Sequence, residues 1–288
     1  MLLSAIGLWA LNLTITRYIL THGFQPLAYA TVRYALAALL FVGLTLFVER
    51  SLRVARRDLG LVVAAAVALW VNQLGFVYAL KSTTASVIAL ILAATPIFAA
   101  LLGLALRTEI LPGRFWIGAA LSFVGVGLVA VGSGGELRGD FGGILLGILT
   151  AATWAVYSML IAPLMRRYSP FRISALVLVL TWVLTALSGL SQTRDQDWTL
   201  GWAVWTLLVF ATLGPLVVTN VLWFRSLDRI GPSRATLATN LQPFVAALFA
   251  VVLLGETIGP LQALGGVLIG LGILAARRRG QRPQQPVD

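Results

Sequence analysis

The chain has 288 residues, of which 59% are hydrophobic and only 11% are charged, and its net charge is +11. Soluble domains contain roughly 45–50% apolar and about 25% charged residues, so this composition excludes an ordinary soluble protein. A membrane-spanning helix needs about 20 apolar residues, and the length therefore accommodates on the order of ten spans with short connections. The sequence predicts an all-α integral membrane protein.

Rare residue types exclude several kinds of chemistry. The chain has no cysteine, one histidine, His22, and one lysine, Lys81, and it lacks the G-x-x-x-x-G-K-[ST] motif. These counts exclude thiol catalysis, metal centres built from Cys or His, and a phosphate-binding ATPase loop. The predicted spans also lack HExxH, G-x-S-x-G and paired aspartates, and they offer no ring of charges for an ion channel. We expect no enzyme, no cofactor and no metal.

Apolar runs bounded by charged, polar, Gly or Pro residues predict the spans. Ten transmembrane helices are expected, at residues 1–20, 26–48, 59–80, 83–106, 113–131, 140–161, 170–190, 201–226, 232–254 and 259–276. Proline is tolerated in the first turn of a helix, where its missing N–H would be unpaired anyway. Prolines of this kind stand at the expected starts, namely Pro26, Pro112, Pro170, Pro232 and Pro260.

The positive charges predict the orientation in the membrane. With the amino terminus in the cytoplasm, 16 of the 21 Lys and Arg residues fall in cytoplasmic segments, and three, Lys81, Arg138 and Arg194, fall on the opposite side. Short loops rich in Lys and Arg stay cytoplasmic. We therefore expect a multi-pass membrane protein with both termini in the cytoplasm. The net charge is explained by topology, and no nucleic-acid partner is expected.

An internal repeat relates the two halves of the chain. Stretches that begin at Leu80 and Leu227 match without a gap at an offset of 147 residues. The identities are Leu80/Leu227, Ser86/Ser233, Pro96/Pro243, Ala99/Ala246, Ala100/Ala247, Glu109/Glu256, Gly118/Gly265 and Gly125/Gly272. Five helices make up each copy, and because five is odd, the second copy enters the membrane upside down. Inverted repeats of this kind are a recurring architecture of secondary transporters.

Three stretches carry a family resemblance: GLWALNLTITRY, PLAYATVRYALAALLF and LATNLQPFVAALFAVVLLGETIGPLQALGGVLIGLGILAA. They resemble the EamA-type half-repeats of the drug/metabolite transporter superfamily, over essentially the full length. Within it the chain is most similar to bacterial YddG-type exporters of aromatic amino acids. The resemblance implies two inverted five-helix halves, 1–131 and 140–276, with a basic cytoplasmic tail at 277–288. It also implies a central cavity, a place in the bacterial inner membrane and export of small metabolites.

Polar and aromatic residues recur at equivalent mid-span positions, where a cavity between the halves is expected. Trp9 and Asn12 correspond to Trp154 and Tyr157 at offset 145; Gln73 and Phe76 correspond to Asn220 and Trp223 at offset 147; Thr95–Pro96 corresponds to Gln242–Pro243. The predicted substrate-binding residues are Trp9, Asn12, Arg33, Gln73, Phe76, Tyr78, Trp154, Tyr157, Asn220, Trp223, Asn240 and Gln242, with Pro96 and Pro243 as hinges. Amides would meet the ammonium and carboxylate groups of a substrate, and aromatic rings its apolar part. The alternative is that these residues bond helices together, anchor at the interface or kink the helices.

Charged residues near the spans suggest different roles. Arg33 lies inside the second span, where it would receive a carboxylate, extend to the interface or bond helix-end carbonyls. For Arg17, which is nearer a span end, we expect extension to the interface, and Glu109 and Glu256 are expected to cap helices. Every Asp and Glu falls in or beside a connection. We therefore expect transport without strict proton coupling.

These observations predict an exporter of small amphipathic metabolites, with aromatic and other neutral amino acids as the first choice, that works by alternating access. The alternative substrates on the same fold are nucleotide sugars, lipids or drugs. Small-residue faces favour close helix packing, and they are formed by Gly143 and Gly147, by Gly266 and Gly270, and by Gly118, Ser122 and Gly125. Packing within the bundle is the first interpretation of these faces, and a homodimer contact is the second. Membrane lipid is the other expected partner.

Overall fold

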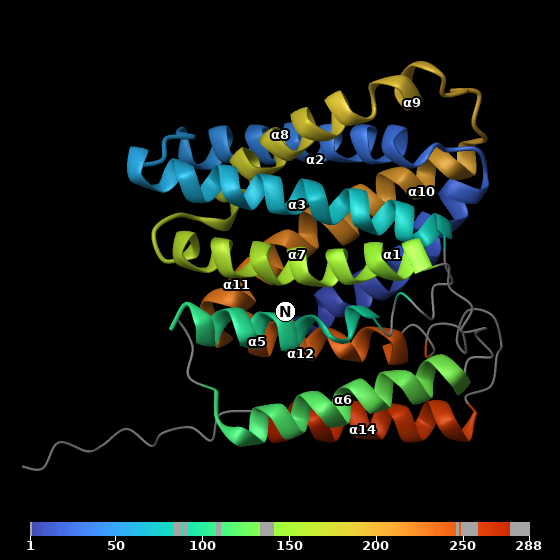
Figure 1. Cartoon of the computed structure of the whole chain (residues 1–288). Coiled ribbons are helices and arrows are strands. Elements are labelled where there is room, and N and C mark those ends of the chain that lie inside the picture. Colours follow the sequence, from blue (N-terminus) through green and yellow to red (C-terminus); the bar gives the residue numbers. More distant parts are fainter. Residues whose placement is uncertain are drawn as a thin grey trace, which may run out of the picture.

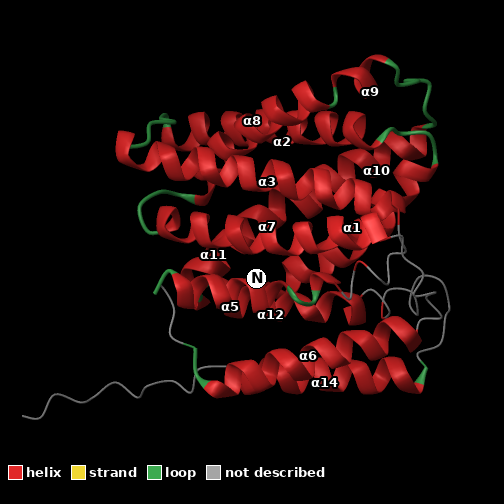
Figure 2. Cartoon of the chain, in the orientation of Figure 1, coloured by secondary structure: helices red, strands yellow, loops and turns green. Residues whose placement is uncertain are grey.

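The computed structural model describes residues 2–82, 88, 91–107, 111–132, 141–245, 248 and 259–276, with backbone only at 13, 14, 17 and 81. All regular elements within these ranges are helices (Figure 2). Six helices are long and apolar enough to cross a membrane: Pro26–Glu49, Arg56–Leu80, Gly113–Gly132, Phe141–Met165, Pro170–Ser188 and Trp202–Ile230. Three shorter apolar helices are Leu2–Asn12, Thr95–Ala105 and Pro260–Ala276.

Most of the described helices begin within a few residues of a predicted start. In chain order they are α1 (Leu2–Thr21), α2 (Pro26–Glu49), α3 (Arg56–Ser82), α5 (Thr95–Ala105), α6 (Gly113–Gly132), α7 (Phe141–Met165), α8 (Pro170–Ser188), α9 (Leu190–Arg194), α10 (Trp202–Thr212), α11 (Thr219–Ile230), α12 (Pro232–Ala238) and α14 (Pro260–Ala276). A π-helical segment, η1 (Leu213–Val218), joins α10 to α11, and a 3₁₀ turn, η2 (Thr239–Leu241), follows α12. Pro26, Pro170, Pro232 and Pro260 stand in the first turns of their helices, as expected.

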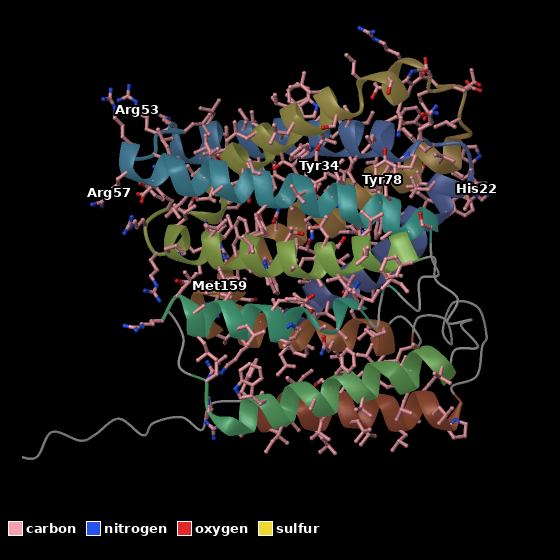
Figure 3. The ribbon with its side chains drawn as sticks, viewed as in Figure 1. His22, Tyr34, Arg53, Arg57, Tyr78 and Met159 are labelled. Atoms are coloured by element: carbon pink, nitrogen blue, oxygen red, sulfur yellow. The ribbon has the colours of Figure 1, made fainter. Side chains whose placement is uncertain are left out.

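The helices lie side by side in a bundle (Figure 1). Helices α6 and α14 pack together at one edge, and α2 packs against α8 at the opposite edge. Arg53 and Arg57 lie at one end of the bundle and His22 lies at the other (Figure 3). Between the edges, α1 packs against α10, η1 and α11, whereas α7 packs against α3 and α5. The first helix of each predicted half therefore contacts the other half.

The pair α6 and α14 has contacts that map onto one another. A Cβ at Gly118 would overlap the Gly272 carbonyl oxygen, and one at Gly265 would overlap that of Gly125. The two contacts are equivalent under the repeat, because Gly118 corresponds to Gly265 and Gly125 corresponds to Gly272 at the offset of 147 residues. Ser122 Oγ donates to the Ile269 carbonyl oxygen at 3.4 Å, between residues that are themselves 147 apart. Reciprocal contacts of this kind are typical of a two-fold axis passing between two elements.

The polar contacts differ between the two ends of the bundle edge that contains α2 and α8. At one end, Arg172 forms an ion pair of 2.8 Å with Glu49, and Asp58 accepts from Tyr168 Oη at 2.7 Å and pairs with Arg167. At the other end, Gln192 Oε1 accepts from the Leu27 N–H at 2.8 Å and Gln196 Oε1 accepts from the Gln25 N–H at 2.7 Å. These side chains satisfy the N–H groups that the start of α2 leaves unpaired.

Two predicted continuous spans are interrupted. The eighth, expected at 201–226, contains the π-helical segment around Pro215, and the ninth, expected at 232–254, contains η2 directly before Gln242 and Pro243. Within the fourth predicted span, expected at 83–106, α5 begins at Thr95 and has Pro96 in its first turn. Proline lacks an N–H and clashes with the preceding turn, which explains why each interruption lies beside one. Glu109 and Glu256, the predicted caps, lie outside the described residues.

Candidate functional site

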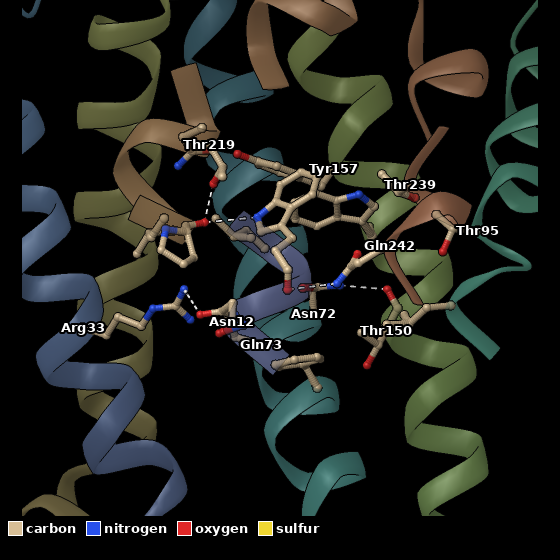
Figure 4. A pocket seen from close by; sticks show the side chains of 18 of the residues that line it. Asn12, Arg33, Asn72, Gln73, Thr95, Thr150, Tyr157, Thr219, Thr239 and Gln242 are labelled. Atoms are coloured by element: carbon tan, nitrogen blue, oxygen red, sulfur yellow. Dashed lines mark hydrogen bonds between the residues drawn. The ribbon is translucent and has the colours of Figure 1, made fainter. Parts of the chain in front are cut away.

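A cavity of about 160 Å³ lies among α1, α2, α3, α7, α11 and the interrupted helices (Figure 4). It is lined by Trp9, Asn12, Arg33, Tyr34, Leu69, Asn72, Gln73, Phe76, Leu92, Thr95, Thr150, Trp154, Tyr157, Pro215, Leu216, Thr219, Asn220, Thr239 and Gln242. Fourteen of these form seven repeat-equivalent pairs: Trp9/Trp154, Asn12/Tyr157, Leu69/Leu216, Asn72/Thr219, Gln73/Asn220, Leu92/Thr239 and Thr95/Gln242. The cavity therefore receives matching surfaces from both predicted halves.

Three tryptophans form an aromatic wall at the cavity. The ring centroids of Trp9 lie 5.6 Å from those of Trp154 and 5.2 Å from those of Trp223. Trp154 lies 5.8 Å from Trp223 and 5.4 Å from Tyr157. Edge-on and tilted arrangements at these distances are the favourable ones for aromatic rings. Trp9 and Trp154 line the cavity, whereas Trp223 is fully buried behind them.

Arg33 is a buried cation, only 5% exposed, that reaches the cavity from α2. Its Nη2 donates to Asn12 Oδ1 at 3.2 Å (Figure 4) and to the Ala211 carbonyl oxygen at 3.1 Å. Its Nε is buried without a hydrogen-bond partner among the described residues. No carboxylate lines the cavity among the described residues, and the groups around the guanidinium of Arg33 are neutral, including the Tyr29 ring, whose centroid is 5.8 Å from Cζ. A buried charge without a counter-ion is costly, and it is suited to a ligand that supplies one.

Further hydrogen bonds fix part of the lining. Trp9 Nε1 donates to the Pro215 carbonyl oxygen at 3.1 Å, and the Trp9 carbonyl oxygen accepts from Gln242 Nε2 at 3.1 Å. Asn72 Nδ2 donates to the Thr150 carbonyl oxygen at 2.8 Å. In contrast, the polar groups of Tyr34, Tyr157, Gln73 and Asn220 have no hydrogen bond to any described residue, which leaves them for a ligand or for water.

The structure brings most of the predicted site residues to this cavity. Nine of the twelve line it: Trp9, Asn12, Arg33, Gln73, Phe76, Trp154, Tyr157, Asn220 and Gln242. Tyr78 points elsewhere, and its hydroxyl accepts from Gln192 Nε2 at 3.0 Å. Asn240 lines a smaller, adjoining cavity of about 30 Å³ with Pro243 and donates to the Ala93 carbonyl oxygen at 3.3 Å, again across 147 residues. Pro96 is buried in the first turn of α5.

Several lining residues were absent from the prediction. The polar ones are Tyr34, Asn72, Thr150, Thr219 and Thr239. Asn72 and Thr219 are repeat equivalents that directly precede the predicted pair Gln73 and Asn220, so the repeat contained a signal for them. Tyr34 and Thr150 have no such signal, because their equivalents, Val179 and Ala5, are apolar. The described residues contain no group of three His, Cys, Asp or Glu side chains that would hold a metal ion.

A bundle of apolar spans around a polar and aromatic cavity has the architecture of a membrane transport protein. The chain belongs to the EamA-like transporter family, whose model matches residues 1–131 and 141–278. Members related to this chain are described as transporters or efflux pumps and not as enzymes. The protein is accordingly a multi-pass membrane transporter of the drug/metabolite type.

Known proteins are similar to this chain in sequence or in fold. An uncharacterized transporter, YwfM of Bacillus subtilis, is 27% identical over 86% of this chain and 83% of its own length. A probable amino-acid metabolite efflux pump of Salmonella typhimurium is 26% identical over 94% of this chain and 91% of its own. A probable terminal-alkyne amino-acid exporter of Streptantibioticus cattleyicolor is 27% identical over 66% of this chain and 63% of its own. One protein crystal structure superimposes on this chain with a TM-score of 0.79 at 20% sequence identity. The match covers 96% of this chain and 94% of the other chain, and it shows the fold.

The burial of the Arg33 charge leads to a prediction about the thermal stability of the protein. Arg33→Met removes a buried charge that has no counter-ion, but it also leaves the Ala211 carbonyl without its donor, which costs about 1–3 kcal/mol. Because these two effects oppose each other, the thermal unfolding midpoint in detergent is expected to change little. The control is Arg172→Met, which removes the ion pair with Glu49 and should lower the midpoint. An equal loss of stability in both variants would mean that the buried charge of Arg33 carries no net cost, and would contradict the prediction.

Proposed function

We propose that this transporter exports small amphipathic metabolites, and that aromatic and other neutral amino acids are its preferred substrates. The observation that carries the proposal is the isolated cation Arg33 in a cavity that also has an aromatic wall. The guanidinium Nη1 has no hydrogen bond to any described residue, so it is free to pair with a substrate carboxylate. Trp9 and Trp154 would contact the apolar side chain.

The size of the cavity supports a small substrate. A cavity of about 150 Å³ holds one benzene molecule, and the volume here is about 160 Å³. This volume suits a single ring or an aliphatic side chain, whereas pockets for drug-sized ligands have roughly 300–1,000 Å³. A nucleotide sugar also carries two phosphates, for which Arg33 is the one cationic residue in the lining. The names of two relatives, an amino-acid metabolite efflux pump and an amino-acid exporter, agree with this substrate class.

We propose alternating access of the two halves as the mechanism, without a proton-carrying carboxylate. The paired lining residues support this, because a cavity on a two-fold axis can open to either side through equivalent movements. The described carboxylates, Glu49, Asp58, Asp195, Asp197 and Asp228, lie at helix ends or in connections and do not line the cavity. The ammonium group of the substrate would meet the free amide oxygens of Gln73 or Asn220.

Efflux from proteoliposomes tests the substrate class. Radiolabelled Phe and Trp should show saturable efflux, and a nucleotide sugar should show none. Truncating a buried tryptophan at a binding site costs about 2 kcal/mol or more, so Trp154→Ala should raise the half-saturation concentration by about 30-fold. Trp202→Ala is the control, because Trp202 is 81% exposed and lies outside the cavity. Saturable efflux of the nucleotide sugar alone would contradict the assignment.

A proton ionophore tests the coupling. Because no described carboxylate lines the cavity, the initial rate of Phe efflux down its concentration gradient should be unchanged when the ionophore collapses an imposed pH gradient. Liposomes without protein provide the background rate. Efflux that requires the pH gradient and stops on addition of the ionophore would overturn the uncoupled mechanism, while leaving the substrate class intact.

A further inference from the structure

The π-helical segment between α10 and α11 lies at the cavity and contains a proline. Segment η1 spans Leu213–Val218, and Pro215 within it lines the cavity. In an α-helix, the residue at position 215 would donate its N–H to the Ala211 carbonyl, but proline has no N–H to donate. Inside a bilayer the freed group must find a donor from a neighbouring helix or from water. Here Arg33 Nη2 donates to it at 3.1 Å.

The carbonyl of Pro215 is also released from its usual helical partner. The Thr219 N–H, which would bond it in an α-helix, instead donates to Gly214 and Leu216. The Pro215 carbonyl oxygen accepts from Trp9 Nε1 at 3.1 Å and from the Thr219 hydroxyl. Two carbonyls, that of Ala211 near the end of α10 and that of Pro215 in η1, thus accept from the two side chains that would hold opposite ends of a substrate.

We propose that Pro215 is a positioning residue of the substrate site. It acts through Arg33 and Trp9: the Ala211 carbonyl directs the guanidinium, and the Pro215 carbonyl orients the indole. Asn12 Oδ1 takes the other Nη2 hydrogen of Arg33 at 3.2 Å, so both hydrogens on that nitrogen are fixed and Nη1 is presented to the ligand. This inference rests on the proposed function, and it gives a physical cause for the positions of the Arg33 and Trp9 side chains. It assigns the substrate class as a carboxylate with an adjacent apolar ring or chain.

The repeat supports a specific role for this position. The residue equivalent to Pro215 is Ala68, which lies inside α3, and the residue equivalent to Arg33 is Leu178 in α8. The proline and the arginine therefore occur together in one half of the cavity and are both missing from the other half. The cavity is symmetric in most of its lining but has one place for a carboxylate. A substrate with a single carboxylate would bind in one orientation.

Restoring the missing N–H tests the proposal. Pro215→Ala supplies a donor that competes with Arg33 for the Ala211 carbonyl and allows the segment to become α-helical. Pro163→Ala is the matched control, because Pro163 lies inside α7 and outside the cavity, and its replacement also restores one N–H. Binding of phenylalanine and of phenylalaninamide, which has a neutral amide in place of the carboxylate, is measured on the purified proteins.

The preference for phenylalanine over its amide should fall by about tenfold or more in Pro215→Ala and stay unchanged in Pro163→Ala. A general loss of packing would weaken both ligands equally and leave the ratio intact, which would overturn the positioning role. A substrate-free structure of Pro215→Ala is the second measurement. It should show Arg33 detached from the Ala211 carbonyl, and an unchanged Arg33 would also overturn the proposal. If the wild type binds neither ligand, the proposed function fails, and the substrate-free structure alone decides the positioning role.

Discussion

A carbonyl that loses its helical partner inside a bilayer must find another donor, because hydrocarbon offers none. In this protein the partners are cavity side chains: Arg33 donates to the Ala211 carbonyl and Trp9 donates to the Pro215 carbonyl. One proline thus links the irregular backbone of the π-helical segment to the cation and to the aromatic wall. In the proposed site, the side chains that satisfy the backbone are also those that would bind a polar ligand.

The second constraint is the repeat. Equivalent residues meet between α6 and α14, where Ser122 contacts Ile269, and again where Asn240 contacts Ala93. Seven equivalent pairs then line the cavity between these contacts and the opposite edge of the bundle. Symmetry provides similar surfaces toward both sides of the membrane, and the departures from it, above all Arg33 and Tyr34, provide the polarity that a zwitterionic or anionic substrate needs.

Sequence patterns predicted an all-helical membrane protein and the starts of most described helices, because hydropathy and the positions of prolines are local signals. The repeat register also identified most of the predicted residues that do line the cavity, since equivalent polar positions converge on one axis. Helical phase explains what failed: Tyr78 is five residues after Gln73 and hence about 140° around α3, and Asn240 lies in the 3₁₀ turn beside Gln242 and lines a different cavity. The π-helical segment was not predicted, because an apolar run that contains Pro215 has the same hydropathy whether its backbone is α or π. Asn72 was missed because hydrophobic patterning gives no side-chain direction within a nearly all-apolar helix.

The central claim is that one cavity holds a carboxylate at Arg33 and an apolar ring at Trp9 and Trp154. The most direct measurement is an anomalous-diffraction structure of the protein with para-iodophenylalanine, in which the iodine marks the end of the ring. We predict a single iodine site beside the indoles of Trp9 and Trp154, with the carboxylate against Arg33 Nη1. An iodine site outside the cavity, or one beside Arg33 with the carboxylate at the tryptophans, would contradict the account.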